Sequence, residues 1–340
     1  MVERRNIHIA DSPIAKVARR LVNLKFDIDT EAKLSPDNIP DDLHGPAQGG
    51  EYGPHFGSEF LSNILPFMPR DFSSEQQTVM NVPTSYIFGC SWRIWPNPDI
   101  LDEEKKEAIA YIHSDSGIND AFYTYIPELS LFFAGEGKNR VNFCRFHNIE
   151  YIPARVMVTH YPDTDRIKIY VLNVASGLDV WAALDDRYIQ KVSHYAYALP
   201  VFRAYGIAIF NQWPEEFPSL TEVLQYEHCC SEELGYKYRT IDADAVQEKL
   251  DKVERDNIFK LQWVRCNLLE LDFSLSNIFM ILLFTMITWI TSLIVWQSTS
   301  VEYLNTVAGT LFTFTSGILF VVFVPVFKCR RKHLRQKLNR

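Results

Sequence analysis

The chain of 340 residues has no apolar run near its N-terminus, so its first residues do not resemble a secretory signal. It has no Asn-x-Ser/Thr sequence for N-glycosylation, and its six cysteines show no Cys-x-x-Cys spacing. A disulfide-rich secreted domain or a zinc site would need such spacings. These absences favour reduced thiols and a soluble part that stays in the cytosol.

Signatures of common enzyme classes are also missing. There is no Walker-A or GxGxxG sequence, no HExxH, and no GxSxG around Ser91. Asp163 and Asp165, like Asp242 and Asp244, form Asp-x-Asp pairs, but that spacing is common in turns and at helix starts. The sequence therefore predicts no enzymatic activity, no cofactor and no metal site.

Charge is unevenly distributed along the chain, whose formal net charge is -8. Residues 1–272 hold 41 of the 42 acidic residues but only 27 of the 34 bases. Binding to nucleic acid needs a basic face that neutralises phosphates. The acidic N-terminal part is therefore not expected to bind nucleic acid.

Two apolar segments follow, at residues 273–296 and 303–327. Neither contains a base, and Glu302 is the only acidic residue between positions 273 and 327. Each segment is long enough to cross a hydrocarbon core of about 30 Å as a helix. Trp296 and Tyr303 stand where interfacial aromatic residues are common, and the connection between the segments is too short for a domain. The sequence predicts a transmembrane hairpin in a lipid bilayer.

The last thirteen residues, 328–340, contain seven bases and no acid. By the positive-inside rule this tail is cytosolic, and two crossings return the N-terminal domain to the same side, so both termini are expected in the cytosol. Cys329 is a candidate for acylation. The tail is expected to lie against anionic lipid headgroups, through Lys328, Arg330, Arg331, Lys332, Arg335 and Lys337.

Each apolar segment carries a stripe of small or polar residues at helical spacing, which allows close packing and hydrogen bonding between helices. The two stripes either face each other within one hairpin, or line a pore formed by several hairpins in a homo-oligomer. The stripe residues are Asn277, Thr285, Thr288 and Ser292 in the first segment and Thr306, Gly309, Thr313 and Gly317 in the second.

The sequence predicts that residues 1–240 form a cytosolic α+β domain. Ser12 and Pro13 resemble a helix start, and the Pro- and Gly-rich stretch 34–60 predicts a loop or a linker between two lobes. Runs rich in β-branched residues predict strands, and residues 154–159 and 166–174 are expected to pair as a hairpin.

Residues from Val246 to Leu271 then follow steps of four and three positions, apolar at every step except Asn257. This pattern predicts a long juxtamembrane helix over residues 241–272 that continues into the first span. Its apolar seam would pack either on its own domain or on the same helix of a neighbouring subunit.

This layout resembles that of the CorA-type two-span metal channels, which have an acidic cytosolic α/β domain, a long helix, two spans and a basic tail. That family carries Gly-Met-Asn at the end of the first span, where this chain has Val295-Trp-Gln-Ser298. The layout favours an oligomeric ion channel or transporter subunit with a cytosolic regulatory domain. The alternative is a membrane-tethered interaction or scaffold protein that uses the hairpin only as an anchor.

Overall fold

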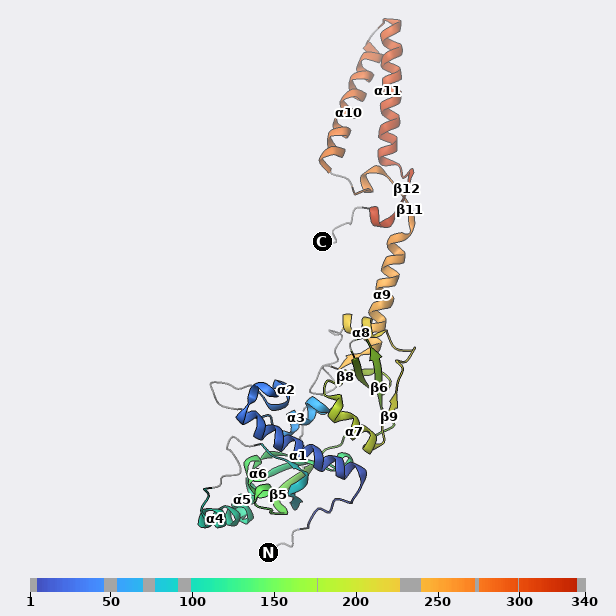
Figure 1. The fold of residues 1–340 in the computed structure, drawn as a ribbon. Coiled ribbons are helices and arrows are strands. Elements are labelled where there is room, and N and C mark those ends of the chain that lie inside the picture. Colours follow the sequence, from blue (N-terminus) through green and yellow to red (C-terminus); the bar gives the residue numbers. More distant parts are fainter. Residues whose placement is uncertain are drawn as a thin grey trace. The chain divides into compact units, whose positions relative to one another are not determined.

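The computed structural model describes residues 5–45, 54–69, 77–90, 99–175, 177–226, 240–272, 275–298 and 300–334. The chain divides into two compact units, Met1–Gln247 and Glu248–Arg340. The first is an α/β unit with mixed sheets, and the second contains two long apolar helices (Figure 1). Each unit is described by itself.

The first helix of the α/β unit, α1 (Pro13–Leu34), begins where the sequence predicts. The Ser12 side chain accepts a hydrogen bond from the backbone N–H of Ala15 at 3.2 Å, which is an N-cap, and Pro13 occupies the first helical position. Leu21 and Val22 are buried on the apolar face of α1. Other helices of this unit are α2 (Asp41–His44), α3 (Gly57–Ile64), α4 (Asp102–His113), α5 (Asp115–Asn119), α6 (Lys138–Phe146), α7 (Tyr195–Tyr205) and α8 (Leu220–Gln225).

The first sheet has the strand order β1-β5-β3-β4-β2 and is mixed. The strands β5 and β3 run parallel, as do β4 and β2, whereas the β1–β5 and β3–β4 pairs are antiparallel. A mixed sheet with helices between its strands agrees with the predicted combination of α and β structure. The bounds are β1 (Thr78–Pro83), β2 (Ile87–Phe88), β3 (Phe122–Ile126), β4 (Leu131–Glu136) and β5 (Tyr151–Val158).

The second sheet, in the order β10-β8-β7-β6-β9, corrects the predicted hairpin of residues 154–159 and 166–174. Both segments are strands, but β5 pairs with β1 and β3, whereas β6 pairs with β7 and β9. The prediction was wrong because β6 forms its hairpin with the following strand, β7, while both partners of β5 lie earlier in the chain. The bounds are β6 (Ile167–Val174), β7 (Gly177–Leu184), β8 (Tyr188–Lys191), β9 (Ala208–Phe210) and β10 (Ile241–Asp242).

One hydrophobic core serves both sheets. Fully buried Phe132 of the first sheet and Ile169 of the second belong to the same buried cluster. The backbone N–H of Phe67 also donates a hydrogen bond to the side chain of buried Gln190 in β8 at 2.9 Å.

Residues 34–60 were predicted as a loop or linker, yet their described part contains α2, the start of α3 and a 3-10 turn at Pro36–Asn38. The described part of this segment belongs to the unit Met1–Gln247.

Asp242 connects β10 to α9 (Ala243–Leu261) as an N-cap. Its Oδ1 accepts hydrogen bonds from the backbone N–H groups of Asp244 at 3.1 Å and Ala245 at 3.4 Å. The Arg187 guanidinium donates to both carboxylate oxygens, at 2.9 and 2.6 Å. These hydrogen bonds, those from Arg187 above all, hold the pKa of Asp242 below its usual value.

We expect Asp242→Ala to destabilise the α/β unit by about 1 kcal/mol through the lost cap alone, and further through the lost ion pair. Asp242→Asn keeps a capping oxygen and loses only the charge. Because the folded pKa is depressed, the charge stabilises the fold at neutral pH, and this contribution disappears as the pH falls through the folded pKa. Thermal unfolding of wild type and Asp242→Asn should therefore differ at neutral pH and converge in acid. Asp244→Asn removes the exposed carboxylate that also pairs with Arg187, at 3.1 Å, and is expected to have the smaller effect of an exposed ion pair.

The second unit corrects the predicted juxtamembrane helix. Helix α9 ends at Leu261, and Trp263–Cys266 forms the strand β11, which pairs antiparallel with β12 (Phe327–Arg330). Residues 263–271 continue the three- and four-residue spacing of apolar side chains without forming an α-helix, and only Leu268–Glu270 makes a 3-10 turn. Residues 263–266 and Leu271 pair instead with the segment that follows the second apolar helix. The helix covers Ala243–Leu261 of the predicted range 241–272.

The two long apolar helices are α10 (Leu275–Ser298) and α11 (Glu302–Phe323), which lie side by side (Figure 1). They are close to the predicted spans 273–296 and 303–327, except that Phe327 belongs to β12. Both are long and apolar enough to cross a membrane, and only 11% and 17% of their most apolar windows are buried within the protein. A core helix of a soluble protein is mostly buried, so these exposed apolar surfaces need another apolar environment.

Candidate functional site

Aromatic and small residues form the contact between α10 and α11 in the hairpin. Trp289 Nε1 donates a hydrogen bond to Ser316 Oγ at 2.8 Å. The Phe312 ring lies between two indoles, with centroids 5.1 Å from Trp289 and 5.7 Å from Trp296. A Cβ at Gly309 would be 3.6 Å from Trp296 Nε1, an ordinary van der Waals distance, so the indole packs against this position. The two helices thus form a packed pair.

The predicted polar stripe of α10 faces this contact. Thr285 and Ser292 are 7% and 5% exposed, and Thr288 is half-buried. Their hydroxyls donate to backbone carbonyls one turn earlier in the same helix, as Thr285 does to Ile281 at 2.9 Å and Thr288 to Phe284 at 2.9 Å. Asn277 lies in the first turn of α10, and its side chain is outside the described part of the structure.

The predicted stripe of α11 is only partly covered by α10. Gly309 lies against Trp296, whereas Thr306, Thr313 and Gly317 are exposed. We call Thr306, Thr310, Thr313 and Gly317 the outer ridge of the hairpin. The structure therefore does not make the two stripes face each other along their length.

The sequence analysis did not single out Asn305, whose buried Oδ1 has no hydrogen-bond partner within the described residues. The presence of an amide side chain in an apolar segment could have indicated this residue.

The ribbon β11–β12 holds the start of the basic tail. Arg330 lies opposite Trp263, with its guanidinium carbon 5.5 Å from the indole centroid, and that of Arg331 is 3.8 Å from the Phe259 ring. These contacts are cation–π interactions. Lys328 and Lys332 are exposed beside them around a cavity of about 630 Å³, while Arg335 and Lys337 lie outside the described residues. The tail thus begins as a strand, with aromatic and cationic groups together.

Cys329, the predicted acylation site, lies in this ribbon beside another thiol. It is half-buried, and its Sγ is 3.0 Å from the Sγ of fully buried Cys266. Burial, together with the hydrogen bond to Cys329, raises the pKa of Cys266 to about 11. Sequence reasoning missed this pair because 62 residues, including both apolar helices, separate the two cysteines.

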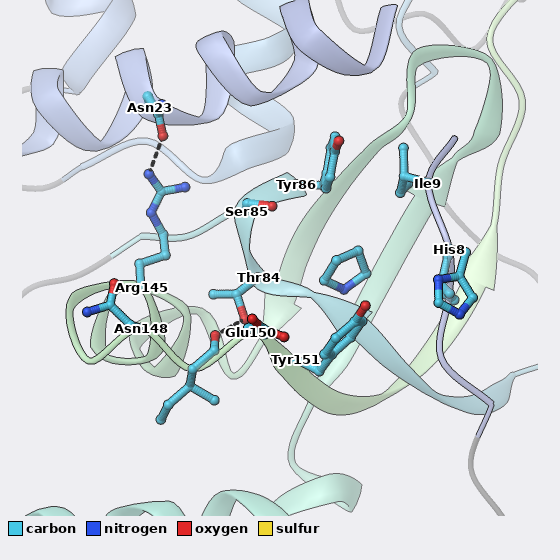
Figure 2. Close-up of a pocket in the computed structure, with 13 residues that line it drawn as sticks. His8, Ile9, Asn23, Thr84, Ser85, Tyr86, Arg145, Asn148, Glu150 and Tyr151 are labelled. Atoms are coloured by element: carbon cyan, nitrogen blue, oxygen red, sulfur yellow. Dashed lines mark hydrogen bonds between the residues drawn. The ribbon is translucent and has the colours of Figure 1, made fainter. Parts of the chain in front are cut away.

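The α/β unit contains a polar cavity of about 560 Å³ that no sequence pattern indicated. Arg145, at the end of α6, reaches across it toward α1 and donates a hydrogen bond to Asn23 Oδ1 at 2.7 Å (Figure 2). Burial lowers the pKa of Arg145, and the buried Nη1 of this side chain has no partner within the described residues. The cavity is lined by Ile7, His8, Ile9, Asn23, Pro83, Thr84, Ser85, Tyr86, Arg145, Asn148, Ile149, Glu150 and Tyr151.

Four chain segments build the wall of this cavity. Thr84 Oγ1 donates to the carbonyl of Ile149 at 2.6 Å, and the N–H of Thr84 donates to the carbonyl of Glu150 at 2.8 Å. The N–H of Ile7 donates to the carbonyl of Asn81 at 3.0 Å, which fixes the N-terminal segment alongside β1. The result is a concave polar surface with hydroxyl, amide and guanidinium groups, which suits a small polar ligand or a protein side chain.

Comparison of the chain with protein families, curated proteins and solved structures gives no match. The similarity to two-span metal channels is therefore one of layout. Among the described residues, no three His, Cys, Asp or Glu side chains gather in a group that could hold a metal ion. The case for a function consequently depends on the hairpin and on the cavity.

Proposed function

We propose that the chain is a two-pass membrane protein whose hairpin anchors a cytosolic α/β unit that binds a protein or a small polar ligand. The packing of α10 on α11 carries this proposal. Thr285 and Ser292 are buried in the contact between the helices, and their hydroxyls are hydrogen-bonded to their own backbone. Side chains held in this way contribute to helix packing and are not free to line a conduit.

The basic tail supports the orientation of this anchor. Lys328, Arg330 and Arg331 come within eight residues of the end of α11, and the short connection between the helices contains no base. This difference favours a cytosolic tail and, after two crossings, a cytosolic α/β unit. Arg330 and Trp263 together combine a cation with an amphipathic aromatic ring, a pairing suited to the headgroup region of a bilayer.

A second candidate function, an oligomeric channel or transporter subunit, is favoured by the outer ridge of α11. Thr306, Thr313 and Gly317 are exposed and small, so an identical helix could approach closely there. A conduit would then lie between hairpins and would be lined by residues other than Thr285 and Ser292.

Ion flux and oligomeric state separate the two functions. We expect the purified full-length protein to be monomeric in detergent and to give proteoliposomes no more flux of monovalent, divalent or anionic species than empty vesicles. Asn277→Leu and Thr313→Leu should change neither result. An oligomer whose flux is abolished by either substitution would contradict the anchor and establish the channel. Val295→Leu, outside both stripes and exposed, is the matched control.

A further inference from the structure

Two cysteines far apart in the sequence meet in the ribbon β11–β12. Cys266 is paired with Phe327 and Cys329 with Val264, so both lie on one face of the ribbon at diagonal positions. Their Sγ atoms are 3.0 Å apart. Because an S–S bond is about 2 Å long, a movement of about 1 Å brings the two sulfur atoms to bonding distance.

We propose that Cys266 and Cys329 form a reversible disulfide, making the ribbon a site of oxidative modification by a peroxide. The two thiols differ in access, which assigns their roles. Cys329 is half-buried and can be reached from solvent, whereas Cys266 is 0% exposed. Cys329 is therefore the thiol that the oxidant meets, and Cys266 is the one that completes the bond. This inference does not depend on what the α/β unit binds.

The chemistry takes two balanced steps. The Cys329 thiol reacts with hydrogen peroxide to give a sulfenic acid and one water, which oxidises the sulfur and reduces the peroxide. The sulfur of Cys266 then attacks the sulfur of Cys329, the S–O bond breaks, and the hydroxide leaves as a second water with the proton of the Cys266 thiol. A dithiol reductant reverses the modification by thiol–disulfide exchange through a mixed disulfide.

The bond would join the chain on either side of the hairpin. Cys266 precedes α10 and Cys329 follows α11, so the disulfide closes a covalent ring that contains both helices. It also consumes the thiol of Cys329, and an oxidised Cys329 cannot carry a fatty acyl group. Disulfide formation and acylation at this residue are therefore mutually exclusive.

A protease site placed in the connection between α10 and α11 tests the bond directly. After cleavage, the C-terminal fragment of the full-length protein contains Cys329 as its only cysteine. We expect peroxide-treated, cleaved protein to run as one band without reductant and as two fragments with reductant. Untreated protein should separate into two fragments in both conditions. In the uncut protein, peroxide should lower the number of maleimide-reactive thiols by two.

Cys266→Ser and Cys329→Ser should each give separate fragments after oxidation, whereas Cys144→Ser, at a buried cysteine of the α/β unit, should behave as wild type. Fragments that separate after oxidation of the wild type, with no loss of reactive thiols, would overturn the proposal. So would a link that persists in Cys266→Ser, because Cys329 would then have another partner. Release of an acyl group from Cys329 by hydroxylamine would assign this residue to lipid modification instead.

Discussion

Phe284→Arg combined with Phe314→Arg is expected to remove the full-length protein from the membrane fraction after alkaline carbonate extraction. Both side chains lie near the middle of their helices, and they are 72% and 67% exposed. Neither contributes to the contact between α10 and α11, so the substitutions leave that packing intact. An arginine at the centre of a spanning helix costs about 2.5–3.5 kcal/mol on the insertion scale, and the two helices are affected together.

Phe284→Leu with Phe314→Leu is the matched control, because it changes the same positions without adding charge. Wild type and this control should both remain in the carbonate pellet. If the wild type were released by carbonate, the apolar helices would not span a membrane and the anchor would be wrong. If the double arginine variant remained in the carbonate pellet to the same extent as the wild type, the helix faces that carry Phe284 and Phe314 would not contact lipid.

Lys25→Met should lower the free energy of unfolding of the α/β unit by about 3–5 kcal/mol. Lys25 and Asp29 lie one turn apart on α1 and form an ion pair, with side chains only 1% and 7% exposed. The Lys25 ammonium is also 5.7 Å from the centroid of the buried Phe60 ring. Removing the ammonium takes a buried positive charge away from the buried Asp29 carboxylate, which is the main cost.

The same helix provides the control, since Lys16 pairs with Asp11 at 3.3 Å where both side chains are exposed. Lys16→Met should cost no more than about 1 kcal/mol. Thermal unfolding of the full-length protein should place Lys25→Met about 6–20 °C below wild type. Lys25→Met with Asp29→Leu, which removes both charges, should recover most of the loss. If Lys25→Met and Lys16→Met lowered the free energy of unfolding equally, the prediction that burial makes the Lys25–Asp29 pair more important for stability would be wrong.

Local sequence signals located several elements correctly. The start of α1 follows from Ser12 and Pro13, because a cap acts within one turn of helix. The apolar helices follow from length and composition alone. The strands β5 and β6 were also located, but their pairing was not, because β5 takes both partners from earlier in the chain and β6 turns into β7 instead. Residues 263–266 illustrate the same limit, because apolar spacing fits a helix while β12 draws the segment into a ribbon.

The candidate sites were predictable only in part. Periodicity placed Thr285 and Ser292 on one face of α10, and the packing of Trp289 and Trp296 against Phe312 decides that this face is the inner one. The cavity around Arg145 had no sequence signal, because its walls come from the N-terminal segment, α1, the turn after β1 and the end of α6. None of these segments contains a motif, and only folding brings them together.

The ribbon also imposes an order of assembly on the C-terminal unit. Strand β11 is synthesised before α10, but its partner β12 follows α11, so β11 has no partner until both helices have been made. Until then its backbone N–H and C=O groups form an open strand edge, which is a template for pairing with another chain. Completion of the hairpin therefore protects β11, and a chain that stops before residue 327 is expected to be more prone to aggregation than the intact one.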